Sequence, residues 1–181
     1  MLRPFPLIIN IGAHDGASVR DFLDFGGLVV AFEPSDLADK IPGHDRLSVK
    51  KQAVWTERGT HDFYCFTGHD TNASSMYDRN FHGKQKVTVD CVTLDDALSG
   101  YGVVDYLAMN IEGAEIPVLK AVSDKTLLKV RQLCVEFHMD LESKQDVQDV
   151  IDRLKKLGFT VDRYLHSNPP DPDHPMIHAR R

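Results

Sequence analysis

The sequence predicts an α/β fold with a mainly parallel sheet, on the strength of two observations. Apolar runs typical of buried strands alternate along the chain with segments in which apolar residues recur at helical spacing, an order that favours an α/β sandwich. The first of these runs, residues 7–11, leads into a turn bracketed by Gly12 and Gly16, and a helix begins near Ser18. A strand, a glycine turn and a helix in this order form the nucleotide-binding corner of a Rossmann-like sheet.

The first half of the chain carries further strand and helix signals. Strands are expected at residues 28–32, 47–54, 60–66 and 86–94, from their apolar and alternating patterns. The helix that begins near Ser18 ends at Gly26, and Ser35 can cap a short helix that ends before Pro42. Residues 67–84 show no apolar period, and a loop of this length inside a compact domain is usually functional or mobile.

The second half continues the alternation. Strands are expected at residues 104–111, 133–138 and 159–165, with a short edge strand at 176–179,. One helix follows the Glu112–Glu115 turn, and another runs over residues 143–157, where Ser143 and Asp146 resemble a capping box. Because no repeat or linker divides the chain, we expect a single domain over residues 1–181 that ends in a proline-rich tail, residues 166–181.

Composition limits the class of protein. The net charge of −6 and the pI near 5.8 argue against nucleic acid as the main partner, since phosphate binding needs basic surfaces. No apolar run approaches the roughly 20 residues of a membrane span, and residues 1–6 do not resemble a signal peptide. The three cysteines lie far apart in strand-like runs, as free thiols do in a reducing compartment. We expect a soluble cytoplasmic protein.

The residues of the glycine turn narrow the choice of ligand. A dinucleotide site places a glycine where this chain has His14, and Asp15 follows it. A bulky ring and an acid are unfavourable beside a diphosphate, whereas S-adenosylmethionine carries a cationic sulfonium and no phosphate. Glu33 ends the second strand about 20 residues after the turn, where such folds bind ribose hydroxyls. The alternative is a turn whose glycines serve packing alone.

Four stretches resemble the FkbM-type family of S-adenosylmethionine-dependent methyltransferases. They are INIGAHDG at 9–16, VAFEP at 30–34, VTLDD at 92–96, and VDYL at 104–107 with NIEGAE at 110–115. The resemblance covers residues 7–164 and implies a Rossmann-like class I methyltransferase sandwich, with a mainly parallel seven-stranded sheet and an antiparallel strand near the C-terminus. It also implies S-adenosylmethionine as the cofactor and O-methylation of a hydroxyl on a small molecule, such as a sugar or natural product.

Three positions depart from the family pattern. The family has aspartate where this chain has Asn10 and Asn110, and lysine where it has Ala108. Asparagine keeps an acceptor oxygen but removes the charge, so a hydrogen bond to the cofactor's ammonium is weaker. Two other functions therefore stay open: an S-adenosylmethionine-binding module that has lost its chemistry, and an NAD-dependent oxidoreductase.

The residues expected to bind the cofactor lie at the ends of several strands. Glu33 accepts hydrogen bonds from the ribose, Gly12 and Gly16 allow close backbone approach, and Ala53 and Val54 line the adenine. Asn10 either binds the amine of the methionine moiety or satisfies backbone at the strand end. The full expected set is Asn10, Gly12, Ala13, His14, Gly16, Glu33, Pro34, Ala53, Val54, Ser74 and Asn110, where Ser74 rests on the resemblance.

Candidates for proton removal from the acceptor follow later strands. They are His138, Glu112 and Glu136. Histidine has an ordinary pKa near 6.5, which suits a base at neutral pH, although a strand-end His138 can equally be bonded to backbone. Glu115 begins a helix, where an acid is favoured for structural reasons. Glu112, Glu136, His138 and Asn110 lack the spacing of a known metal motif, so we expect no metal.

Overall fold

The computed structural model describes residues 5–66, 73–79, 83–165 and 174–181. Its main sheet contains β1 (Leu7–Ile11), β2 (Leu28–Phe32), β3 (Leu47–Lys50), β7 (Val104–Met109), β8 (Val130–Glu136), β9 (Thr160–Leu165) and β10 (Pro175–Arg180). A smaller sheet contains β4 (Ala53–Trp55), β5 (Gly59–Phe66) and β6 (Lys84–Thr93). The helices are α1 (Ala17–Asp24), the 3-10 helix η1 (Asp36–Lys40), α2 (Leu94–Ala97), α3 (Glu115–Ala121), α4 (Asp124–Leu127) and α5 (Lys144–Lys156).

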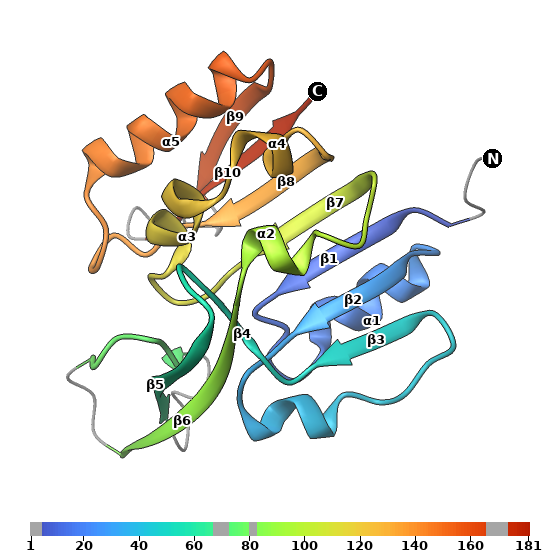
Figure 1. Ribbon diagram of the computed structural model, residues 1–181, viewed down its shortest axis with the longest axis vertical. Helices are drawn as coiled ribbons and strands as arrows, with labels where there is room; N and C mark the ends of the chain where they lie inside the picture. The colour runs from blue at the N-terminus through green and yellow to red at the C-terminus, as the bar shows by residue number, and fades with distance from the viewer. Residues whose placement is uncertain (1–4, 67–72, 80–82, 166–173) are drawn as a thin grey trace.

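The main sheet has the predicted architecture (Figure 1). Its seven described strands lie in the order β3-β2-β1-β7-β8-β10-β9. The pairings β2–β3, β1–β2, β1–β7 and β7–β8 are parallel, and β10 is antiparallel to both β8 and β9. The expectation of a mainly parallel seven-stranded sheet with an antiparallel strand near the C-terminus is confirmed. The chain order reverses beside β1, which places a crevice at the carboxyl ends of β1 and β7.

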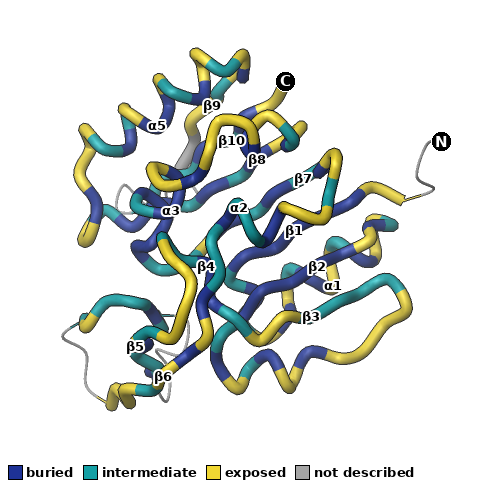
Figure 2. Tube along the Cα trace, viewed as in Figure 1, coloured by how far each residue is buried: buried dark blue, intermediate teal, exposed yellow. Residues whose placement is uncertain are grey.

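The central strand is apolar throughout because both of its faces are covered. Every residue of β1 is buried (Figure 2). Ile8 packs with Val19 and Leu23 of α1 on one face, while Leu7 and Ile9 belong to the larger core cluster on the other. That larger cluster also holds the apolar face of α5, as the sequence predicts. Burial on two faces explains a continuous apolar run in place of an alternating one.

Two expectations about strands are wrong in detail. Residues 47–54 do not form one strand, because the chain leaves the main sheet after Lys50. Lys51 and Gln52 follow, and the next strand, β4, pairs with β6 in the smaller sheet. The strand at 176–179 is not an edge strand, since β10 lies between β8 and β9 with Ile177 and Ala179 buried. Its proline, Pro175, is the first residue, where a missing N–H is tolerated.

The remaining local signals are largely those expected. Thr93 and Asp96 form a capping box at α2, and Ser143 caps α5 by accepting a hydrogen bond from the Asp146 N–H. Cys65, Cys91 and Cys134 are free thiols. Within the described ranges, no helix is both long and apolar enough to span a bilayer. Of the 67–84 loop and the 166–181 tail, residues 67–72, 80–82 and 166–173 lie outside the described residues.

Candidate functional site

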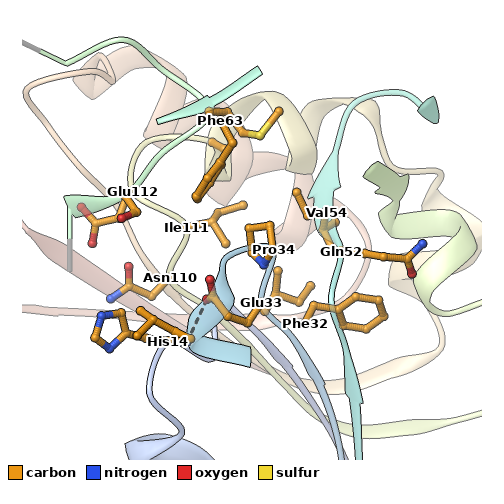
Figure 3. A pocket seen from close by; sticks show the side chains of 17 residues that line it. His14, Phe32, Glu33, Pro34, Gln52, Val54, Phe63, Asn110, Ile111 and Glu112 are labelled. Carbon is orange, nitrogen blue, oxygen red and sulfur yellow. Dashed lines mark hydrogen bonds between the residues drawn. The ribbon is translucent and has the colours of Figure 1, made fainter. Parts of the chain in front are cut away.

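A pocket opens at the carboxyl ends of β1, β2 and β7 and is closed on its far side by β4 and β5 (Figure 3). It encloses about 710 Å³, including its open mouth. Nine of the residues expected at the site line it: Gly12, His14, Glu33, Pro34, Ala53, Val54, Ser74, Asn110 and Glu112. Asn10, Ala13, Gly16, Glu136 and His138 do not line it. Residues far apart in sequence therefore meet where the topology predicts a ligand.

Glu33 is a buried carboxylate with a fixed orientation. Its Oε2 accepts a hydrogen bond from the His14 N–H at 2.9 Å, and its Oε1 accepts from the Ser35 N–H at 3.0 Å and the Ser35 hydroxyl at 2.6 Å. The side chain is not an exposed acid at a strand end, since the residue is only 6% exposed. These bonds use both lone-pair sites of Oε1 and one of Oε2, so Oε2 keeps an acceptor site and the carboxylate is preorganised at the pocket.

The two glycines of the turn each lie close to a neighbouring part of the protein. Gly12 has φ +84°, and a Cβ there would lie 1.8 Å from the carbonyl oxygen of Asn110. Glycine is therefore required at position 12 by the backbone at the end of β7, which lies against it. Gly16, also at positive φ, packs against Ile41. His14 adopts φ +50° without being glycine, a conformation that non-glycine residues adopt rarely and often at functional sites.

Asn10 and Ala13 lie behind the pocket wall. Asn10 is buried, and its Nδ2 donates to the Ser18 hydroxyl at 2.8 Å, which ties the end of β1 to α1. Ala13 is buried in the cluster that α1 forms with Ile8 and Ile41. Both residues hold the turn in place from outside the cavity.

Asn110 and Glu136 form a polar pair beside the pocket. Asn110 lines the pocket, and its Nδ2 donates to Glu136 Oε2 at 3.0 Å across the ends of β7 and β8. The Asn110 N–H donates to the carbonyl of Ile11, which continues the β1–β7 pairing. The amide at position 110 can donate to the Glu136 carboxylate, which an aspartate there could not do when ionised.

Glu112 lies at the centre of a charged cluster that sequence reasoning only partly predicts. Its Oε1 is 3.2 Å from His138 Nε2, and its Oε2 is 2.9 Å from Arg79 Nη1. Arg79 lies in the long loop and carried no signal of its own, because an isolated arginine among polar residues is typical of a solvated surface. The backbone of Glu112 has φ +56°. Like His14, Glu112 is a non-glycine residue of the pocket lining with a left-handed backbone conformation.

His138 lies just beyond the end of β8 and is almost fully buried. Its Nδ1 is 3.3 Å from Glu115 Oε1, so each ring nitrogen faces a carboxylate. Burial lowers the pKa of His138, but the attraction of Glu112 and Glu115 outweighs burial and raises the pKa to about 10. His138 is therefore charged at neutral pH, whereas a base requires the neutral ring.

Two further glutamates hold this region together. Glu115 is fully buried and accepts the backbone N–H groups of Ile111 and Gly113, which fixes the turn before α3. Glu142 accepts the N–H groups of Ile116 and His138. Burial and the charge of Glu115 raise the pKa of Glu142 to about 7. Glu115 has the structural role that its helix-start position predicts.

Stability is expected to fall as pH rises from 6.5 to about 10. The folded pKa of His138 is raised, so its contribution is complete below pH 6.5 and is lost as pH rises through about 10. The raised pKa of Glu142 acts in the same direction but only from pH 4.5 to about 7. Urea unfolding across this range measures the slope, and the His138→Gln variant should have a flatter profile above pH 7. Equal slopes for both proteins would show that His138 is not a buried cation.

The described residues contain no group of three His, Cys, Asp or Glu side chains arranged to hold a metal ion. The polar pair of Asn110 and Glu136 and the cluster around Glu112 are joined instead by hydrogen bonds and ion pairs.

Comparison with known proteins agrees with the geometry. The chain is 27% identical over 157 residues to the 2-O-methyltransferase NoeI of Sinorhizobium fredii, a match that covers 75% of this chain and 64% of that protein. The chain thus spans less than two thirds of that relative. Two solved structures share the fold: a methyltransferase FkbM from Methylobacillus flagellatus (TM-score 0.62, 16% identity, 98% of this chain and 45% of that one) and an rRNA methylase from Streptococcus thermophilus (TM-score 0.57, 11% identity, 99% and 89%).

The family assignment rests on most of the chain. Residues 10–161 match the methyltransferase FkbM domain, and this range includes the glycine turn, Glu33 and the cluster around Glu112. The resemblance drawn from four short stretches is confirmed, and the class I methyltransferase fold with it. This chain belongs to the FkbM family of methyltransferases, whose cofactor is S-adenosylmethionine.

Proposed function

We propose that this chain transfers a methyl group from S-adenosylmethionine to a hydroxyl of a small-molecule acceptor. The observation that carries the proposal is Glu33, a buried carboxylate held by three hydrogen bonds at the mouth of the β1 and β2 corner. A carboxylate in this place is suited to accept hydrogen bonds from the two hydroxyls of a ribose.

The pocket lining fits this cofactor better than a dinucleotide. Among the described residues that line it, none is lysine or arginine, while Glu33 and Glu112 are both acidic. Glu112 is paired with Arg79 and His138, so Glu33 is the lining acid whose charge no lysine or arginine offsets among the described residues. Its charge is unfavourable for a diphosphate and favourable for a sulfonium and an ammonium. The NAD-dependent alternative is therefore disfavoured by the same residues that favour S-adenosylmethionine.

The two ends of the pocket differ in chemistry, which suggests how the cofactor is divided between them (Figure 3). Val54, Phe32 and Gln52 lie at one end, with Glu33 between them and the opposite end. His14, Asn110 and Glu112 lie at that opposite end. We assign the adenine to the end with apolar residues, the ribose to Glu33, and the amino-acid part to the polar end.

S-adenosylmethionine supplies an electrophilic methyl group when it is bound. The chain's own residues must hold the acceptor hydroxyl in near-attack geometry, which accounts for a large part of such rate accelerations. They must also receive the hydroxyl proton. Glu112 has a cation against each oxygen, and His138 is itself charged, so neither is well suited to take that proton.

Glu136 is the better candidate for the proton acceptor. It is half-buried beside Asn110, and no cation is paired with it in the part of the chain that the structure describes. Its Oε2 accepts the amide of Asn110, which orients the carboxylate without neutralising it. On this assignment Glu112 and His138 position the turn after β7.

The class of acceptor rests on the relative and on charge. The relative NoeI is a 2-O-methyltransferase, and a net charge of −6 favours a small molecule over a polyanion. The shared fold does not itself exclude nucleic acid, since an rRNA methylase has it too. The departures at Asn10 and Asn110 leave a binding module without activity as the second candidate.

Thermal unfolding with ligands is the first test. S-adenosylmethionine at 100 times its dissociation constant should raise the melting temperature by about 5 °C or more, and NAD should not. A screen of sugars and other hydroxylated molecules with methyl-labelled cofactor then identifies the acceptor. Stabilisation by NAD alone would contradict the proposal, and binding without transfer to any acceptor, nucleic acid included, would favour the binding module.

A further inference from the structure

A single arginine joins three segments around the pocket. Arg79 is 8% exposed at its side chain, with Nη1 2.9 Å from Glu112 Oε2 and Nη2 2.5 Å from Asp140 Oδ2. Glu112 lies in the turn between β7 and α3, and Asp140 lies between β8 and α5. Arg79 itself belongs to residues 73–79, which lie between β5 and β6.

Residues 73–79 form part of the pocket wall. Ser74 and Met76 line the pocket, and Ser75 is fully buried between them. Ser75 pairs with Tyr64 of β5 through two backbone hydrogen bonds, and its hydroxyl donates to the carbonyl of Glu112 at 2.7 Å. This wall therefore contacts Glu112 twice, at its backbone through Ser75 and at its carboxylate through Arg79.

The backbone of Glu112 needs such support. A glutamate at φ +56° is strained, and strain of this kind persists only where the surrounding contacts impose it. The guanidinium bonds one carboxylate oxygen and His138 approaches the other. Lysine, a point charge, cannot reproduce a planar group that reaches two carboxylates on separate segments.

We propose that Arg79 is a positioning residue for the methyl donor, acting through Glu112 on the polar end of the pocket. The inference rests on the proposed function. Arg79 holds Glu112 and the wall of residues 73–79 beside Asn110 and His14, at the end assigned to the amino-acid part of the cofactor (Figure 3). Its ion pairs with Glu112 and Asp140 lie away from Glu33 and from the end assigned to the adenine. Its effect is therefore selective for S-adenosylmethionine over adenosine.

Calorimetric titration with S-adenosylmethionine and with adenosine tests this selectivity. The Arg79→Met variant should bind S-adenosylmethionine about tenfold or more weakly, with adenosine affinity unchanged within about twofold. The Arg79→Lys variant should recover part of the loss, and it replaces Arg79→Met if that protein does not fold. The control is Arg180→Met, which breaks an exposed ion pair with Asp162 on β10 and β9 and should change neither affinity.

Each outcome separates the inference from the function on which it rests. Equal weakening of both ligands would mean that Arg79 only supports the fold, and no weakening of either would mean that it has no role; both contradict the inference. Wild-type protein that does not bind S-adenosylmethionine would instead contradict the proposed function. In the Arg79→Met/Glu112→Gln double variant, the loss should not exceed the larger single loss, whereas additive losses would contradict action through Glu112.

Discussion

The Gly12→Ala variant is expected to lose more than about 4 kcal/mol of stability, which is exceptional for one methyl group. A Cβ at this position would lie 1.8 Å from the carbonyl oxygen of Asn110 and 2.9 Å from its carbonyl carbon. Both atoms are backbone at the end of β7, so no side-chain rotation relieves the overlap. The carboxyl ends of β1 and β7 would have to separate, and with them two sides of the pocket. Urea unfolding measures the loss.

Gly26 provides a matched control. It has φ +90°, close to the φ of Gly12, but nothing lies within 4 Å of a Cβ built on it. The Gly26→Ala variant therefore carries only the cost of a left-handed alanine, about 1–2 kcal/mol. If both variants lose the same amount of stability, backbone strain accounts for the effect and the close approach of β1 and β7 is not what requires glycine at position 12.

The Glu33→Gln variant is expected to lose at least about tenfold in affinity for S-adenosylmethionine. An amide offers one neutral acceptor where the carboxylate offers two charged ones, and charge-assisted hydrogen bonds are about twice as strong as neutral ones. Its NH₂ group must also face either the His14 N–H or the Ser35 donors. Affinity and stability should both fall, so the titration is made well below the variant's melting temperature.

Glu57→Gln is the control for loss of a carboxylate. Glu57 is exposed, and the side chain that faces its carboxylate is His61, with 3.9 Å between Oε1 and Nε2. Removing its charge should leave cofactor affinity and stability nearly unchanged, because exposed ion pairs contribute little. A Glu33→Gln protein that binds as tightly as this control would exclude Glu33 from the binding site.

Sequence patterns predicted the structure correctly where a short stretch of residues determines a single turn, strand end or helix cap. The glycine turn, the position of Glu33 and the caps of α2 and α5 all depend on residues within a few positions of one another. The seven-stranded, mainly parallel sheet and its antiparallel strand near the C-terminus followed from the family resemblance. The division of residues 47–54 between two sheets did not, because Lys51 and Gln52 interrupt the strand without a glycine or proline that would mark the break.

The charged cluster could be predicted only in part, because it depends on contacts between distant segments. Glu112 and His138 were recognisable as polar residues at strand ends, but Arg79 is 33 positions from Glu112 and 61 from Asp140. Pairing also changes chemistry: the two glutamates beside His138 turn an expected neutral base into a cation. Sequence gives a residue's ordinary pKa, whereas its charge in the fold depends on neighbours that only the structure places.

A crystal structure of the chain with S-adenosylmethionine tests the central claim most directly. We predict the ribose hydroxyls within hydrogen-bonding distance of the Glu33 carboxylate, the adenine against Val54, and the amino-acid part toward Asn110. Adenosine bound elsewhere on the molecule, or an empty pocket at saturating cofactor, would contradict the assignment of this site.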